Sequence, residues 1–72
     1  MDLPEYMRKV RRGMEMSQLE LAKELSVSFS SIKRWEKKQV NPSKLARKSF
    51  LDFCKARGIE IPPEILDDGE TV

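Results

Sequence analysis

The segment SQLELAKELSVSFSSIKRWEKK (residues 17–38) contains two helix starts separated by one short turn. Ser17, with Glu20 three residues later, forms a capping box, which predicts a helix that continues to about Leu25. Ser28 is a second candidate cap, so a second helix is expected directly after it. The few residues between the two helices leave room only for a tight turn, and helices joined in this way meet at an elbow.

Apolar residues at helical spacing predict which side of each helix is buried. The second helix should end at about Glu36 or Lys37. A small residue is needed where the two helices cross closely, and Ala22 meets that need. Val27 and Ile32 occupy the two positions of a hydrophobic staple around the second cap. The residues expected to face inward are Leu21, Ala22 and Leu25 on the first helix and Ile32 and Trp35 on the second.

A helix is also expected at the start of the chain. Asp2 can cap it, Glu5 would complete a capping box, and Pro4 falls in the first turn, where proline is tolerated. An apolar stripe at helical spacing follows and predicts the buried side. The members of this stripe are Leu3, Met7, Val10 and Met14.

A fourth helix is predicted from about Ser43 to Arg57, after a loop over residues 38–42. Gly58 is suited to the position just past its end, because glycine tolerates a left-handed backbone. The expected core side of this helix carries Leu45, Ala46, Phe50, Phe53 and Cys54.

The segment after Gly58 reads IEIPPEILDDGETV. Its two adjacent prolines argue against a regular helix. Ile59 and Ile61 either fold back on the body of the domain or meet another subunit. We expect residues 1–58 to form one domain and residues 59–72 to form an acidic C-terminal tail that is ordered at most in part.

Length and composition indicate one small all-helical domain. The chain has 72 residues, and alternating strand patterns are absent from it. The one cysteine, Cys54, cannot form an internal disulfide, which fits a reducing compartment; it is either a small core residue or a redox sensor. The sequence has no histidine and no apolar run long enough to span a membrane. We therefore expect no enzymatic activity, no metal or cofactor and no membrane insertion.

The net charge of +2 is distributed unevenly along the chain. Residues 28–57 contain nine Lys and Arg residues against two acidic ones, a net charge of +7, whereas residues 58–72 contain five acidic residues and no base. A basic body suggests a polyanionic partner, and the alternative is an ordinary solvated surface. The acidic tail could also fold across the basic face and compete with such a partner.

The segment quoted first resembles the helix-turn-helix of the lambda-repressor/Cro family of bacterial and phage regulators, the XRE family. The resemblance covers about residues 5–57. Glycine is common in that family at three positions where this chain has Glu15, Ser26 and Lys38, and at the turn residue Ser26 a glycine would be more favourable by roughly 1 kcal/mol. The pattern S-Q-x-x-L-A-x-x-L-x-V-S-x-x-x-I-x-x-W-E is met by Ser17, Gln18, Leu21, Ala22, Leu25, Val27, Ser28, Ile32, Trp35 and Glu36, and Arg11 and Pro42 also fall at family positions.

The resemblance implies an all-α, lambda-repressor-like fold, a compact bundle of four to five short helices, with residues 1–58 as a helix-turn-helix DNA-binding domain. It implies a sequence-specific transcriptional regulator, a repressor that binds a palindromic operator in double-stranded DNA as a homodimer. Such a protein works in the cytoplasm, associated with the nucleoid when bound to DNA. One alternative is a DNA-binding antitoxin or mobile-element accessory protein that acts with a protein partner through residues 59–66. Another is a protein-interaction module that does not bind DNA.

The helix over residues 29–37 would then enter the major groove of the DNA. Phe29 suits contact with a thymine methyl group, and Arg34 suits bidentate pairing with guanine. Phe29 could instead pack into the core, and Arg34 could be solvated or bind a phosphate. Lys33 suits either a base or a phosphate. The predicted base contacts are Phe29, Ser30, Lys33 and Arg34.

Phosphate contacts are expected around this helix. Gln18 begins the preceding helix, whose N-terminus suits a phosphate, although an ordinary helix-start glutamine is the alternative. Lys44, near the start of the fourth helix, either clamps the DNA backbone or belongs to a solvated face. The resemblance also implies a structural ion pair between Arg11 and Glu36, in which the guanidinium can fork onto the carboxylate. The predicted phosphate contacts are Gln18, Ser28, Lys37, Lys38 and Lys44.

Overall fold

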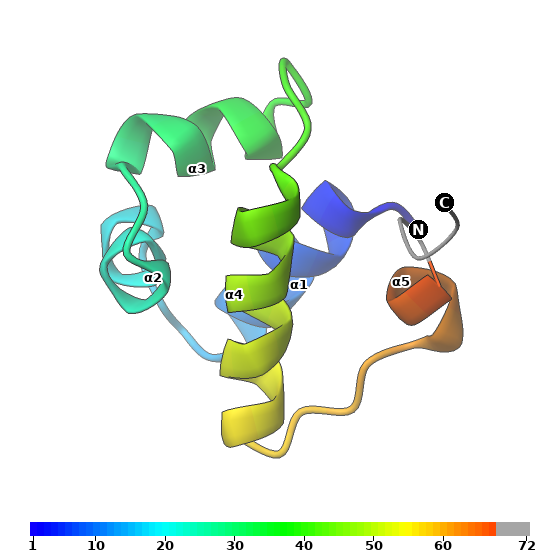
Figure 1. The fold of residues 1–72 in the computed structure, drawn as a ribbon. Helices are drawn as coiled ribbons and strands as arrows, with labels where there is room; N and C mark the ends of the chain where they lie inside the picture. Colours follow the sequence, from blue (N-terminus) through cyan, green and yellow to red (C-terminus); the bar gives the residue numbers. More distant parts are fainter. Residues whose placement is uncertain (68–72) are drawn as a thin grey trace.

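The computed structural model describes residues 1–67 and contains five helices in this part of the chain (Figure 1). No strand is present among the described residues, so the predicted all-helical fold is confirmed. Residues 68–72, which form the end of the predicted acidic tail, lie outside the described part. The helices are α1 (Leu3–Gly13), α2 (Gln18–Leu25), α3 (Phe29–Glu36), α4 (Lys44–Ala56) and α5 (Pro63–Asp67).

Helices α1 to α4 each begin at a side chain that accepts a hydrogen bond from the backbone N–H three residues later. Each such cap satisfies a donor that the first turn leaves free and contributes about 1 kcal/mol. The capping box at Ser17 is complete, since the Glu20 carboxylate accepts from the Ser17 N–H at 2.7 Å. The box expected at Asp2 is half formed, because the Glu5 carboxylate instead accepts from Lys38. The caps are Asp2, Ser17, Ser28 and Ser43.

The same four helices also end in a shared backbone motif. Past each helix end, one residue has a left-handed backbone, and its N–H and the next N–H bond back to carbonyls of the last turn, as in the Schellman motif. Three of the four left-handed residues are not glycine, and they stand where the family resemblance leads us to expect glycine. Each of these side chains strains the backbone by about 1 kcal/mol. The left-handed residues are Glu15, Ser26, Lys38 and Gly58, with φ of 56°, 57°, 60° and 69°.

The core lies between α1, α2, α3 and α4. Tyr6 and Phe50 meet edge to face in it, with ring centroids 5.9 Å apart. Cys54 is fully buried, and burial raises the pKa of its thiol to about 11, so the thiol packs as a small protonated group. The other predicted core residues that are buried are Leu3, Met7, Val10, Leu21, Ala22, Leu25, Ile32, Trp35, Ala46 and Phe53.

One predicted core residue is wrong. Leu45 is 74% exposed, and Leu51, at 7%, is buried instead. Leu45 lies on the same face of α4 as the polar residues Ser49 and Asp52, four and seven positions later, whereas Leu51 lies three positions before the buried Cys54. The buried stripe of α4 therefore keeps the other four predicted residues and takes Leu51 in place of Leu45 at its edge.

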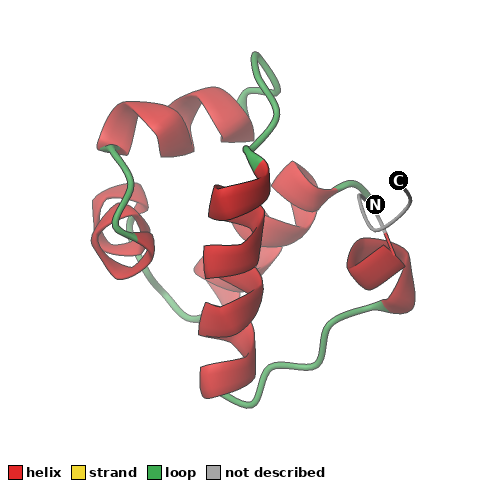
Figure 2. Cartoon of the chain, viewed as in Figure 1, coloured by secondary structure: helices red, strands yellow, loops and turns green. Residues whose placement is uncertain are grey.

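Helix α3 lies at one end of the molecule (Figure 2). Its inner side packs on the core through Ile32 and Trp35. The opposite side, which we call the outer side of α3, is not covered by any other helix within residues 1–67.

The segment after α4 folds back on the body of the domain. Ile59 and Ile61 pack against the core, and the Tyr6 hydroxyl donates a hydrogen bond to the Glu60 carbonyl at 2.7 Å. The expectation that the two prolines prevent a helix is wrong, because α5 begins at Pro63. Proline suits the first position of a helix, where its missing N–H has no helical partner to lose.

A buried side chain and an arginine are among the contacts that hold α5 in place. Ile65 is 1% exposed. Arg47 Nη2 donates to the backbone carbonyls of Ile65 at 2.7 Å and Leu66 at 2.8 Å, and so satisfies acceptors that a helix end leaves free. Figure 1 shows α5 well away from the outer side of α3. Residues 59–67 of the predicted acidic tail therefore do not lie across the outer side of α3 in this structure.

Candidate nucleic-acid interface

The outer side of α3 is the candidate site. Ser26, with its left-handed backbone, turns the chain between α2 and α3, and the buried Ile32 and Trp35 fix the rotation of α3 about its axis. Burying that edge leaves the remaining positions of the helix facing outward. The exposed residues of this side are Phe29, Ser30, Lys33, Arg34 and Lys37.

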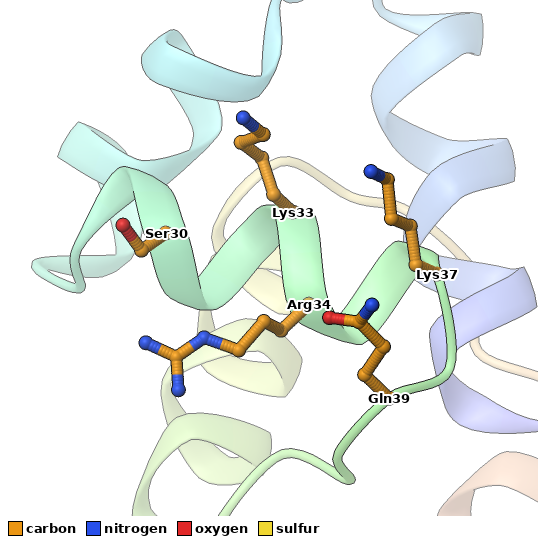
Figure 3. Close-up of a pocket in the computed structure, with 5 residues that line it drawn as sticks. All are labelled: Ser30, Lys33, Arg34, Lys37 and Gln39. Carbon is orange, nitrogen blue, oxygen red and sulfur yellow. The ribbon is translucent and has the colours of Figure 1, made fainter.

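Five polar side chains line a shallow hollow of about 280 Å³ on this side (Figure 3). Most come from α3 and its cap, but Gln39 comes from the loop that follows. Figure 3 shows the Gln39 amide between the side chains of Arg34 and Lys37. The hollow is lined by three cations and two neutral groups that form hydrogen bonds. It is therefore complementary to a ligand surface that is anionic and rich in hydrogen-bond acceptors. The lining residues are Ser30, Lys33, Arg34, Lys37 and Gln39.

Gln39 is absent from the residues predicted from the sequence. A signal for it was present, because Lys38 stands at a position where the family commonly has glycine. Such a glycine position indicates a left-handed residue that turns the chain back over the end of the helix. The residue that follows the left-handed one, here Gln39, is therefore brought back beside the helix instead of leading the chain away from it.

Phe29 lies on the surface and not in the core. Its side chain is 43% exposed, so the alternative in which the ring packs inward does not occur in this structure. The Lys33 ammonium lies 5.3 Å from the centroid of the Phe29 ring, a cation–π contact of about 0.5–1 kcal/mol at an exposed site. The aromatic ring and the lysine therefore present one apolar surface next to one positive charge.

The three lysines predicted to contact phosphates differ in their surroundings. Lys37 is the residue just past the end of α3, and Lys44 is the first residue of α4. Both are exposed, and neither forms an ion pair with another residue of the described chain. Lys38 Nζ lies 2.6 Å from a Glu5 carboxylate oxygen and 3.3 Å from one of Asp2. The hydrogen bond to Glu5, and to a smaller extent the one to Asp2, raises the pKa of Lys38. Lys38 therefore has two carboxylate partners to leave before it could reach a phosphate.

Two other predicted phosphate contacts also take part in internal hydrogen bonds. Gln18 Nε2 donates to Glu36 Oε1 at 3.1 Å. Ser28 Oγ accepts from the Ser31 N–H at 3.0 Å and lies 2.8 Å from the Ser31 hydroxyl oxygen. Gln18 is the first residue of α2, so its backbone N–H belongs to the donors that the helix start leaves free. That backbone donor, more than the side-chain amide, is available to an anion.

Arg11 and Glu36 connect α1 to α3 behind the candidate site. Arg11 Nε donates to Glu36 Oε2 at 2.7 Å and Arg11 Nη2 to Glu36 Oε1 at 2.9 Å, so the contact is bidentate. The Arg11 Nη1 group donates to the Met16 carbonyl at 2.9 Å. The two side chains are only 12% and 8% exposed. The pair therefore braces the end of α3 from the inner side.

The protonation of this pair follows from its contacts. Burial raises the pKa of the Glu36 carboxyl, but the hydrogen bonds from Arg11 and Gln18 and the charges of Arg11 and Arg8 outweigh it, and the pKa lies below its usual value. The hydrogen bond to Glu36 raises the pKa of Arg11. Both groups are therefore charged at neutral pH.

The described residues offer little for other kinds of site. No group of three or more His, Cys, Asp or Glu side chains within residues 1–67 is arranged to hold a metal ion. No helix in that part of the chain is long and apolar enough to cross a membrane.

Comparison with known protein families agrees with this geometry. A family profile described as helix-turn-helix matches residues 7–46, more than half of the chain. The match runs from α1 into the first turn of α4 and contains the whole outer side of α3. Comparison with curated proteins and with solved structures gives no significant match.

Proposed function

Because the chain belongs to the lambda-repressor/Cro-like (XRE) family of helix-turn-helix DNA-binding transcription regulators, we propose that it recognises a specific DNA sequence through α3. The outer side of α3 would lie in the major groove, with the N-terminal part of the helix nearest the base edges. The observation that carries this proposal is the exposed set of aromatic, hydroxyl and cationic side chains on an otherwise well-packed helix.

Each exposed side chain of α3 has a chemical match among the bases. The Phe29 ring suits the methyl group of thymine, and Arg34 suits the two acceptors of guanine in the major groove. Ser30 can donate or accept, and Lys33, held beside the Phe29 ring, can donate to a guanine or a phosphate. A good bidentate contact discriminates between bases by about 1–3 kcal/mol.

Phosphate contacts would flank these base contacts. Lys37 and Lys44 present ammonium groups on either side of the loop between α3 and α4, and the N-terminus of α2 at Gln18 presents backbone donors. Ser28 stands at the start of α3, where its backbone would lie close to the groove. Lys38 is the weakest member of this set, because it is already paired with Glu5 and Asp2.

We further propose that the protein acts as a repressor and binds a palindromic operator as a homodimer. A two-fold symmetric site requires two copies of α3 about 34 Å apart, one for each half-site. The alternative, an antitoxin or accessory protein with a partner docked on residues 59–66, has less support. The isoleucines of that segment pack against this chain's own core, which leaves Leu66 as its exposed large apolar side chain.

The test is a selection of bound duplexes from a randomised DNA pool at near-physiological salt, followed by affinity measurements on the recovered site. We expect a motif with two inverted half-sites about one helical turn apart. Arg34→Glu should abolish specific binding, whereas Lys55→Glu, an equal change of charge at an exposed position near the end of α4, should leave most of it. A random pool, or equal losses in the two variants, would refute the proposal.

A further inference from the structure

We propose that Gln39, outside the recognition helix, is an additional base-reading residue that selects an adenine next to the base read by Arg34. The inference rests on the proposed function and adds a specificity determinant to it. It follows from the way α3 ends, from what the corresponding residues do at the other helix ends, and from the chemistry of the hollow.

The Schellman motif at the end of α3 places Gln39 against Arg34. Lys38 has a φ of 60°, and its N–H donates to the Trp35 carbonyl at 2.9 Å. The Gln39 N–H then donates to the Arg34 carbonyl, also at 2.9 Å. This backbone bond brings Gln39 back beside the last turn of the helix, which carries Arg34. Both side chains line the same hollow, as Figure 3 shows.

Gln39 differs from its counterparts at the other three helix ends. The residues that follow the left-handed residues of α1, α2 and α4 are Met16, Val27 and Ile59, and each packs against the core. At the end of α3 the same backbone motif carries a polar, exposed residue, Gln39. The residue after the left-handed one thus packs on the core at three helix ends, whereas at the end of α3 it is exposed to solvent.

The backbone around Gln39 is held in place from two directions. Its own N–H is bonded to α3, and the preceding residue, Lys38, reaches the carboxylates of Glu5 and Asp2 at the start of α1. A side chain on such a fixed backbone loses less conformational entropy on binding than one on a free loop. Lys38, a poor phosphate ligand because of these ion pairs, thereby acquires a role as the anchor of Gln39.

The amide group of Gln39 gives the hollow a chemistry that its other lining residues lack. Three lining residues are cations, which suit the acceptors of guanine or a phosphate: Lys33, Arg34 and Lys37. Ser30 can form a hydrogen bond with any of several bases. A glutamine amide has one donor and one acceptor side and pairs with N6 and N7 of adenine in the major groove. Since Arg34 suits guanine, neighbouring side chains would read a guanine and an adenine at adjacent base pairs.

The experiment is the randomised-pool selection repeated with the full-length wild type and three variants, each first checked for its helical circular dichroism. Gln39→Ala should lose the adenine preference at one position of each half-site, from at least about five-fold to near one, with the rest of the motif kept. Gln39→Glu should change that preference from adenine to cytosine, because a carboxylate accepts from cytosine N4. Val40→Ala changes the next exposed residue of the same loop and should leave the motif unaltered.

Each outcome separates the two proposals. If the wild type yields a motif and Gln39→Ala yields the same motif at the same affinity, the role of Gln39 is refuted while the proposed function stands. If Gln39→Ala keeps the motif but binds every sequence more weakly, Gln39 contacts a phosphate, and the inference is again wrong. If the wild type itself yields no motif, both proposals fail.

Discussion

Replacing Glu36 by Gln should remove about 3 kcal/mol from the free energy of unfolding. The Glu36 carboxylate accepts two hydrogen bonds from Arg11 and one from Gln18. Removing one partner of a buried ion pair costs about 3–5 kcal/mol, and the lower end applies because the two side chains remain 12% and 8% exposed. Domains of this length have a total stability of only about 4–11 kcal/mol. The variant should therefore melt roughly 12–24 °C below the wild type.

The assay is thermal and urea unfolding at pH 7, followed by far-UV circular dichroism, on the wild type, Glu36→Gln, Arg11→Met and the double variant. The control is the double variant itself. Once both partners are gone, no buried charge is left without a counterion, so it should lose at least about 1.5 kcal/mol less than the sum of the single losses. Additive losses, or a loss below about 1 kcal/mol in Glu36→Gln, would show that the pair does not brace α3.

The pH dependence gives an independent check on the same group. The pKa of Glu36 is lowered in the folded state, so the folded state binds this proton less tightly than the unfolded state does. The stability that the carboxylate contributes is therefore full above the unfolded pKa, about 4.3, and is lost as the pH falls through the lower folded value. The wild type should be more stable than Glu36→Gln at neutral pH, and the difference should shrink in acid. A difference that stays constant down to pH 3 would contradict the reasoning.

Three further predictions concern the helix ends, the DNA backbone and the C-terminal segment. Glu15→Gly and Ser26→Gly should each raise the unfolding free energy by about 0.5–1 kcal/mol in urea titrations, because glycine relieves the left-handed strain and neither side chain packs in the core; a loss of stability would mean that the strain is absent. Lys37→Ala and Lys44→Ala should each weaken binding to all sequences alike and reduce the slope of log affinity against log salt by about 0.9, and an unchanged slope would remove that lysine from the phosphate contacts. Ile65→Ala should cost about 2–5 kcal/mol, since this side chain is 1% exposed, and a negligible change in the melting curve would show that α5 adds nothing to the core.

Much of the fold was predictable because its signals are local. The starts of α1 to α4 follow from Asp2, Ser17, Ser28 and Ser43, each of which caps the helix by bonding a backbone N–H three residues away. The left-handed turn at Ser26 follows from the short distance between two helical patterns. Information of this kind lies within a few residues of the chain and does not depend on the tertiary structure.

The errors lie where contacts over a long sequence distance decide. Leu45 and Leu51 are equally apolar and lie at opposite edges of the apolar stripe of α4, and the packing of α4 against the rest of the domain buries Leu51, although the polar residues on the Leu45 face were a local signal for that choice. The helix at Pro63 exists because Ile65 finds a buried site and Arg47, from α4, binds its carbonyls. Neither contact leaves a periodic pattern in so short a segment.

The candidate site shows the same division. The exposed set on α3 could be predicted from helical spacing alone, once Ile32 and Trp35 were assigned to the core. The place of Gln39 does not follow from helical spacing, because it depends on the backbone path after the helix; the signal for it was the family glycine position that Lys38 occupies. The partners of Lys38 were also unpredictable, since Glu5 lies far from it in the sequence and meets it only in the folded chain.

The way α5 is attached implies an order of local opening. This helix has five residues, too few to be stable alone, and Ile65 and the two hydrogen bonds from Arg47 hold it to the domain. Its detachment should therefore require less free energy than global unfolding, and its amides should exchange with deuterium well before those of α2 and α3. Each such opening would give proteases access to the C-terminal segment while α3 keeps its shape. The rate at which the chain is degraded would then depend on α5, which lies away from the outer side of α3.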